Sequence, residues 1–297
     1  MPGYSPITFF AINSVNEILG VLCGILQSEG SGIKSYLSTR VIVFGGPLVI
    51  NKELKIANNL LESLVRSYKS KSIYIEFRNL FEISFLKEVF LRHKFSYKRH
   101  LNLIVNLDDD TLLKKRMSES RLRQVKAGLK SGAVIKQAET IEELKEFYQI
   151  LKEKYSQKIK KPLVDFKMFE NFYRLPDAGK IFLIKYVGKV IGGIVCPVFG
   201  NKVIYEWYIG GMDDKFKKQY PSVLATYAPI EYGLKNKLVN FDFMGAGSPG
   251  RDYGVREFKS KFGGKQVEYG RYIRINYPLL FSAGEIGLKF LGMIKSL

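Results

Sequence analysis

The chain has few of the residues that build metal centres or disulfides. Its 297 residues include two cysteines, Cys23 and Cys196, and two histidines, His93 and His100. Both cysteines lie in apolar runs, so we expect them to be buried and reduced, as in a cytoplasmic protein. No Cys/His spacing fits a metal site, so we expect no bound metal and no structural zinc. No Ser–His or Cys–His arrangement of a nucleophilic catalytic site stands out either.

Long apolar runs are also missing. No window of about 18 residues is apolar and free of charge, so no membrane-spanning helix is expected. Residues Met1 to Phe10 lack a basic segment followed by an apolar core, so they do not form a secretory signal. We expect a cytoplasmic protein and leave open a peripheral contact with the inner face of the membrane.

Positive charge is abundant. The chain has 47 Lys+Arg against 28 Asp+Glu, a formal net charge of +19 that is spread over both halves of the sequence. Its hydrophobic content of 46% excludes a disordered chain. A basic folded surface favours polyanions, which are nucleic acid, anionic lipid head groups or diphosphate-bearing substrates, and charge alone does not separate these three.

Strand and helix patterns alternate along the chain, which is typical of an α/β or α+β architecture. In the first half the patterns predict helices over 14–28, 51–69 and 82–94, and strands over 40–44, 72–78 and 101–107. In the second half they predict helices over 108–130, 141–156, 165–175 and 221–236, and strands over 133–137, 180–187, 189–198, 202–208, 239–244 and 266–275. We therefore expect two domains, 1–106 and 107–297.

Two helical segments allow two interpretations each. The predicted helix 108–130 is strongly basic and includes Arg121 and Lys126. It is either a connecting helix with a thin buried stripe, or a helix that lines an anion-binding groove and uses these two residues to bind substrate. The C-terminal segment 283–297 is either a helix packed on the body or a membrane-surface anchor.

Three stretches of the second half resemble a known family. They are Arg121–Gly132, the crossover Tyr220-Pro221-Ser222 with Phe241-Asp242-Phe243-Met244-Gly245, and the basic loop Phe258-Lys259-Ser260-Lys261-Phe262-Gly263-Gly264. In this order they resemble the FemABX branch of the GNAT acyltransferases, the enzymes that build peptidoglycan interpeptide bridges, and the related FemAB-like acetyltransferase domains. The resemblance implies two GNAT-like domains, each a mixed sheet flanked by helices.

The chain departs from the pattern in two places. It has no heptad run for the coiled-coil arm of longer members, and Lys217-Lys218-Gln219-Tyr220-Pro221-Ser222 replaces the usual acetyl-CoA loop of simpler GNAT enzymes. The resemblance implies an aminoacyl-tRNA or acyl-CoA donor and no permanently bound cofactor. It further implies tRNA and a UDP-linked or lipid-diphosphate precursor as partners.

Lys259 is the candidate for the positive group of an acyl-transfer site. Such a reaction needs a deprotonated amine, a stabilised oxyanion and a proton for the leaving group, and an ammonium can stabilise the oxyanion. FemABX-type enzymes have a Phe-Lys pair associated with catalysis, so the resemblance implies this role for Lys259 and substrate contact for Phe258. Alternatively, Lys259 is a surface lysine in a basic run with Arg256 and Lys261.

Glu206 is the candidate general base. The resemblance to GNAT enzymes implies a base on this strand, where a half-buried carboxylate could accept a proton from the incoming amine. Strand alternation predicts that Glu206 and Tyr208 share one face while Tyr205 and Trp207 share the other. A structural pairing of Glu206 with a basic neighbour is the alternative.

Four further residues are candidates for binding or proton transfer. Tyr253 and Tyr220 could donate a proton or hydrogen-bond a substrate, and Asp242 is either a contact to the acceptor or a structural partner. Ser222 stands at the start of the predicted helix 221–236, where free backbone N–H groups favour a phosphate or an oxyanion.

Three hypotheses follow. The first is a FemABX-like acyl- or aminoacyltransferase that forms an amide on an amine of a cell-wall precursor or surface-polysaccharide sugar. The second is an acyl-CoA-dependent N-acetyltransferase acting on a small or sugar amine. The third is a non-catalytic basic protein that binds nucleic acid or a membrane surface.

Overall fold

The computed structural model describes residues 3–160, 162–250 and 253–294. It divides into two compact units, each built on its own mixed sheet. Unit 1 comprises the chain up to His100 together with the chain from Glu268 onward, and unit 2 comprises Leu101–Val267. The expected fold class, two mixed sheets flanked by helices, is confirmed.

The boundary between the two units differs from the expected division at residue 106, because one strand from each side of that division belongs to the sheet of the other unit. Strand β7 (Asn102–Asn106) pairs with β13 and β14 in the sheet of unit 2, whereas β15 (Arg271–Ile275) pairs with β5 and β6 in the sheet of unit 1. Unit 1 is therefore discontinuous in sequence. An apolar strand pattern reports that a strand is buried but not which sheet buries it, so the sequence could not reveal this exchange.

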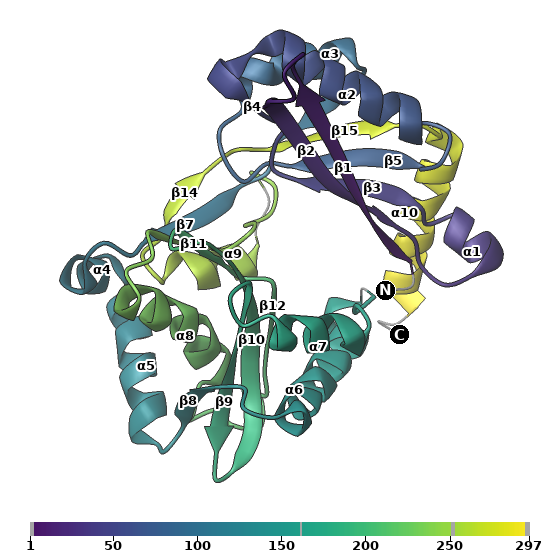
Figure 1. The fold of residues 1–297 in the computed structure, drawn as a ribbon. Coiled ribbons are helices and arrows are strands. Elements are labelled where there is room, and N and C mark those ends of the chain that lie inside the picture. The colour runs from purple at the N-terminus through teal and green to yellow at the C-terminus, as the bar shows by residue number, and fades with distance from the viewer. Residues whose placement is uncertain (1–2, 161, 251–252, 295–297) are drawn as a thin grey trace. The chain divides into compact units, whose positions relative to one another are not determined.

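Unit 1 has a seven-stranded sheet in the order β1-β2-β3-β5-β15-β6, with β4 paired to β2 (Figure 1). Its strands are β1 Tyr4–Ile12, β2 Ile18–Gln27, β3 Arg40–Phe44, β4 Leu48–Val49, β5 Tyr74–Arg78, β6 Ser96–Lys98 and β15. Its helices are α1 Gly32–Tyr36, α2 Leu54–Tyr68, α3 Lys87–Arg92 and α10 Pro278–Ile294, with 3₁₀ turns at Ile50–Lys52 and Ser84–Leu86.

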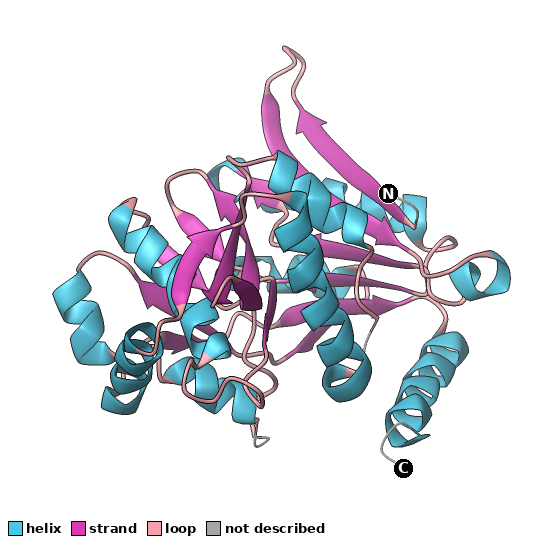
Figure 2. Ribbon diagram, turned by 90° about the horizontal axis from the view of Figure 1, so that it is seen from below, coloured by secondary structure: helices cyan, strands magenta, loops and turns pink. Residues whose placement is uncertain are grey.

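The helix predicted over 14–28 is wrong, because β2 occupies this segment and forms a long antiparallel hairpin with β1 (Figure 2). The residues of β2 are apolar on both faces, so its sequence does not alternate, although most of the strand is only partly buried. Gly20 and Gly24 weaken a helix at this position. Cys23 lies in this strand and is exposed, contrary to expectation, whereas Cys196 is buried as predicted.

The core of unit 1 lies between the sheet and α2 and α3. Leucines 60, 61 and 64 of α2 are fully buried against the strand residues Val41, Val43, Ile75 and Phe77. The opposite face of the sheet bears a charged cluster, in which Glu76 accepts hydrogen bonds from Arg78 at 2.9 Å and from Arg271 at 2.8 Å. On the same face, Phe281 of α10 makes an edge contact with Tyr74, so the start of this helix packs on the body of the unit.

Unit 2 has an eight-stranded sheet in the order β14-β7-β13-β11-β10-β9-β8, with β12 also paired to β10. Its strands are β7, β8 Val134–Gln137, β9 Gly179–Tyr186, β10 Lys189–Phe199, β11 Val203–Tyr205, β12 Tyr208–Gly211, β13 Asn240–Asp242 and β14 Lys265–Val267. Its helices are α4 Asp110–Arg116, α5 Glu119–Lys130, α6 Ile141–Lys154, α7 Phe166–Arg174, α8 Pro221–Lys235 and α9 Gly254–Ser260, and a π-helical turn, η3, spans Tyr155–Ile159.

Helices cover both faces of this sheet: α5 and α8 lie on one side, and α6 and α7 lie on the other (Figure 1). The helix predicted over 108–130 is two helices, because the chain turns at Met117 and Ser118, where the Ser118 hydroxyl caps α5. The segment predicted as a basic loop, Phe258–Gly264, is partly helical, since α9 runs as far as Ser260. This helix carries Lys259 into the interior of the unit.

Candidate active site

The strand that carries Glu206 contains a bulge. Val198 of β10 pairs with Ile204 of β11, whereas Val195 pairs with Tyr208 of β12, so this strand has one more residue than β10 between the two pairs. The strand β11 also pairs with β13 in parallel, but β12 pairs with β10 alone. Glu206 therefore lies between β11, which is paired with β13, and β12, which is not. Such an opening between neighbouring strands of a sheet is a common place for a ligand to bind.

The bulge also breaks the alternation that the sequence predicted. The Trp207 ring meets Phe172 and the Tyr208 ring meets Phe169, both on α7, with centroids 5.1 Å apart in each pair. Two consecutive side chains thus lie on the same side of the sheet, and the expected division of faces is wrong. The extra residue in the bulge resets the alternation at this point.

Lys259 and Glu206 form a buried ion pair. The distance from Lys259 Nζ to Glu206 Oε1 is 2.8 Å, and the two side chains are 11% and 6% exposed. The same ammonium donates to the carbonyl oxygens of Phe243 and Gly245, each at 2.9 Å. All three ammonium hydrogens therefore have acceptors, which satisfies a charge that would otherwise be costly to bury.

A strained turn after β13 presents these two carbonyls. Met244 has a φ of 53°, a left-handed conformation that is rare for a residue with a side chain. The Asp242 carboxylate accepts the Met244 N–H at 2.6 Å, and the Asn102 side-chain oxygen accepts the Gly245 N–H at 2.7 Å. Asn102 also donates to Asp242 at 2.7 Å, so the two side chains hold the turn in place together.

Asp242 is buried at the centre of this network. Burial raises the pKa of Asp242, while the hydrogen bonds from Asn102 and Met244 and the charge of Lys259 act in the opposite direction. The Asp242 backbone carbonyl accepts the Glu206 N–H at 2.8 Å, which ties the bulge to the turn. Asp242 thus contacts the site's own backbone, which supports the structural alternative weighed for this residue.

Arg121 is buried between two aromatic rings and does not lie on an open groove. Its guanidinium is 4.3 Å from the Phe258 ring centroid and 4.6 Å from that of Phe262, and it donates to the Phe258 carbonyl at 3.1 Å and to Gln124 at 2.7 Å. Burial lowers the pKa of Arg121 to about 10. Arg121 therefore clamps α9, which carries Lys259, against α5.

The start of α8 already holds a carboxylate. The Ser222 N–H donates to Asp213 Oδ1 at 3.0 Å, and the Ser222 hydroxyl donates to Asp213 Oδ2 at 2.5 Å. Tyr220, with a φ of 48°, occupies the N-cap position but makes no side-chain capping bond. Gly211 permits the close approach of β12, since a Cβ there would lie 2.6 Å from the Ser222 nitrogen. The anion site predicted at this helix end is thus filled by Asp213.

The remaining predicted residues lie at the surface of unit 2. Tyr253 is 44% exposed at the N-cap position of α9, where its ring approaches Gly247. Lys126 is exposed on α5. The structure thus brings together Lys259, Glu206, Asp242, Phe258 and Arg121, and it places Ser222 with Asp213 beside β12.

Three residues near this network were missed by the sequence reasoning. Asn102 and Asn106 flank the apolar centre of β7, and the local sequence does not show that Asn102 is the buried one of the two. Tyr155 begins the π-helical turn after α6, and burial, together with the charge of Glu206, raises its pKa to about 12. Lys154 precedes it, and burial lowers its pKa. Nothing in the local sequence marks these last two residues, because their environment comes from the tertiary fold.

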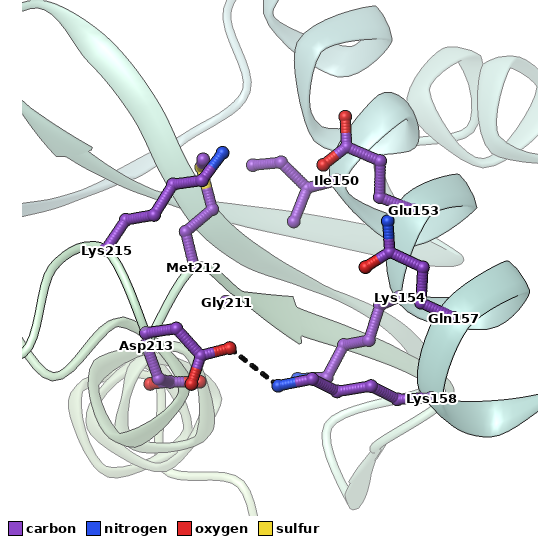
Figure 3. A pocket seen from close by; sticks show the side chains of 10 residues that line it. Ile150, Glu153, Lys154, Gln157, Lys158, Gly211, Met212, Asp213 and Lys215 are labelled. Atoms are coloured by element: carbon purple, nitrogen blue, oxygen red, sulfur yellow. Dashed lines mark hydrogen bonds and ion pairs between the residues drawn. The ribbon is translucent and has the colours of Figure 1, made fainter. Parts of the chain in front are cut away.

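Lys154 lines a pocket of about 250 Å³ between the end of α6 and the loop after β12 (Figure 3). The α6 side contributes Ile150, Glu153, Lys154, Gln157 and Lys158, and the loop contributes Gly211, Met212, Asp213, Asp214 and Lys215. Within the described residues, no group of three or more His, Cys, Asp or Glu side chains could hold a metal ion. No helix in the described part of the chain is long and apolar enough to cross a membrane.

Two mixed sheets flanked by helices, with the second sheet opening beside a buried Lys–Glu pair, define a tandem GNAT-type fold. Residues 183–285, which include Glu206 and Lys259, match the model of the FemAB family. The FemAB-like resemblance drawn from the sequence motifs is thereby confirmed. No curated protein matches this sequence.

Solved structures share the fold at low sequence identity. The crystal structure of FemX superposes with a TM-score of 0.72 and 16% identity, covering 95% of this chain and 90% of that chain. L-PGS from Bacillus licheniformis has a TM-score of 0.62 and 14% identity, with coverage of 91% and 84%. A tandem GNAT protein from the clavulanic acid biosynthesis pathway has a TM-score of 0.59 and 9% identity, with coverage of 93% and 84%. These matches show the fold, and the family match over residues 183–285 indicates a transferase of the FemAB type.

Proposed function

We propose that this chain is an amide-forming acyl- or aminoacyltransferase whose active site is the Glu206–Lys259 pair. The observation that carries the proposal is the burial of this pair at the point where β12 and β13 separate. Buried ionisable side chains in a defined geometry beside a sheet opening are frequent at active sites. The match of residues 183–285 to the FemAB family adds support.

The geometry suggests how the two groups act together. The acceptor amine attacks the acyl carbonyl carbon, a C–N bond forms, and the amine proton passes to Glu206. Protonation of Glu206 weakens its bond to Lys259, which frees one ammonium hydrogen for the oxyanion. As the intermediate collapses, the C–O bond to the donor breaks, and the proton on Glu206 passes to the leaving oxygen. Phe258 and Arg121 hold α9, and with it Lys259, in position.

The start of α8 favours an aminoacyl-tRNA donor over acyl-CoA. A CoA diphosphate would need the backbone N–H groups at this helix end, but the Asp213 carboxylate accepts from Ser222 there and repels a second anion. The net charge of +19 supports phosphate contacts with a tRNA. With acyl-CoA the broken bond would instead be C–S.

The acceptor that we propose is an amine of a cell-wall precursor or of a surface-polysaccharide sugar, in UDP-linked or lipid-diphosphate form. Supporting it are the FemAB family match and the basic charge of the chain. The site of action would be the cytoplasm, with peripheral contact at the membrane for a lipid-linked acceptor.

The test of this function is donor-dependent binding and transfer. Purified protein would be mixed with aminoacyl-tRNA or with acetyl-CoA, and thermal stability and amide formation on a UDP-linked muropeptide would be measured. A rise in melting temperature and RNase-sensitive transfer with aminoacyl-tRNA alone are expected. Transfer with acetyl-CoA alone would establish the N-acetyltransferase instead, and binding of tRNA without transfer by any donor would favour a non-catalytic protein.

A further inference from the structure

The pocket between α6 and the loop after β12 is lined by three lysines, of which Lys154 is half-buried while Lys158 and Lys215 are exposed. Of the lining residues other than Lys154, three are already engaged: Lys158 pairs with Asp214 at 2.6 Å, and both oxygens of Asp213 accept from Ser222. Because Lys154 is partly withdrawn from solvent, an anion bound in the pocket would form a stronger ion pair with it than with an exposed lysine.

Charge and size restrict the anion. Lys154, Lys158 and Lys215 are balanced by Glu153, Asp213 and Asp214, so the lining as a whole is neutral. The three carboxylates of the lining would repel a dianionic phosphate or a diphosphate strongly. A ligand with a single carboxylate has less charge to compensate and can pair with Lys154 alone. A volume of about 250 Å³ corresponds to roughly eight water molecules at about 30 Å³ each, enough for an amino-acid residue.

The pocket is connected to the proposed catalytic pair through the chain itself. Lys154 is followed by Tyr155, and the charge of Glu206 acts on both side chains. Tyr155 opens the π-helical turn η3, an uncommon conformation that is frequent at functional sites. The Tyr155 ring lies 6.1 Å, centroid to centroid, from the ring of Tyr208, which follows Glu206 by two residues, so the pocket borders the strand that carries the residue proposed to receive the amine proton.

We propose that this pocket binds the carboxylate of an amine-bearing acceptor, with Lys154 as the group that holds it. The acceptor is then an amino acid or a peptide with a free carboxylate. Its identity as acceptor rests on the proposed function, whereas the carboxylate site itself does not. Binding can therefore be tested without turnover.

Isothermal titration with Nα-acetyl-L-lysine, which has both a carboxylate and an amine, is the direct test. Its methyl ester, which lacks the carboxylate charge, is the matched ligand. We expect the ester to bind at least about tenfold more weakly than the acid, and Lys154→Met to weaken binding of the acid by a similar factor. Lys152→Met, on the same helix and outside the pocket, serves as control and should leave the affinity within about twofold.

Equal affinity for acid and ester, or an unchanged affinity in Lys154→Met, would overturn the proposal. Tighter binding of inorganic phosphate than of the acid, abolished in the same variant, would overturn the carboxylate assignment.

If Lys154→Met does not fold, the wild-type protein can be labelled with trace sulfo-NHS acetate. Diacetyl-lysine, which has a carboxylate and no amine, should then slow labelling of Lys154 several-fold and leave Lys152 unchanged, and equal rates with and without it would contradict the site. Binding of the acid without amide formation would contradict the proposed function but would still support a carboxylate site at Lys154.

Discussion

Glu206 and Lys259 lie 2.8 Å apart in the interior of unit 2, and the lysine ammonium has no hydrogen left without an acceptor. The pair is thus a structural element of the resting protein as well as the proposed catalytic one. These two roles predict different consequences for single and double substitutions.

Breaking the pair from one side should be destabilising. Lys259→Met leaves the Glu206 carboxylate buried without a partner, which costs about 3–5 kcal/mol. The double variant Lys259→Met/Glu206→Gln should lose less stability than the sum of the losses in the single variants Lys259→Met and Glu206→Gln. In the double variant neither position leaves an uncompensated charge. Urea unfolding of the four proteins provides the measurement, and strict additivity would show that the two side chains do not interact.

Arg121 should matter for stability rather than for an open binding groove. Arg121→Met removes two ring contacts and two hydrogen bonds from a buried guanidinium, a loss of about 2 kcal/mol or more. Lys126→Met, an exposed change on the same helix, should shift stability by less than about 0.5 kcal/mol. Equal melting temperatures for the two variants would contradict the clamp between α5 and α9.

Asp213 should both cap α8 and repel diphosphates. Asp213→Ala is expected to cost about 1 kcal/mol of stability, as the loss of a carboxylate from a helix start typically does. The same change should increase binding of CoA, because the Ser222 N–H becomes available to a phosphate. Asp214→Ala, which removes only an exposed ion pair with Lys158, is the control. Unchanged CoA affinity in Asp213→Ala would remove the argument against a CoA donor.

Stability in acid should depend on Glu76. Burial alone would raise the pKa of Glu76, but the charges and hydrogen bonds of Arg78 and Arg271 outweigh it and hold the pKa below its ordinary value of 4.5. The stabilisation is thus fully present above pH 4.5 and is lost as the pH falls through the lower native pKa.

Glu76→Gln should accordingly destabilise unit 1 at pH 7 by about 1–3 kcal/mol, and the difference from wild type should shrink toward pH 3. Glu62→Gln, an exposed change on α2, is the control. Urea unfolding across this pH range tests the prediction, and a difference that grows in acid would contradict the sign.

The helices and strands were largely predictable where a residue with a strong positional preference, such as a helix-capping threonine, marks the start or end of the element. The helix expected over 141–156 is α6, and its start is fixed by Thr140, whose hydroxyl accepts a hydrogen bond from the Glu143 N–H. The segment 14–28 was not predictable, because the apolar residues of β2 do not alternate and their spacing fits a helix as well.

The candidate site was predictable in its residues and not in its geometry. Glu206 and Lys259 could each be chosen from the motifs that contain them, but their pairing depends on the bulge at Trp207 and on α9, and neither has a sequence signal. The sequence places Ser222 at a helix start that favours an anion, but it does not show that the carboxylate of Asp213, from a preceding loop, occupies this position.

Single-turnover transfer from aminoacyl-tRNA to the acceptor measures whether Lys259 and Glu206 perform amide formation. We expect Lys259→Met and Glu206→Gln each to slow the transfer by about 100-fold or more, with folding verified by circular dichroism. Lys261→Met, which removes an exposed lysine two residues away, should keep the wild-type rate. A folded Lys259→Met protein that transfers within about twofold of the wild-type rate would show that Lys259 does not take part in amide formation.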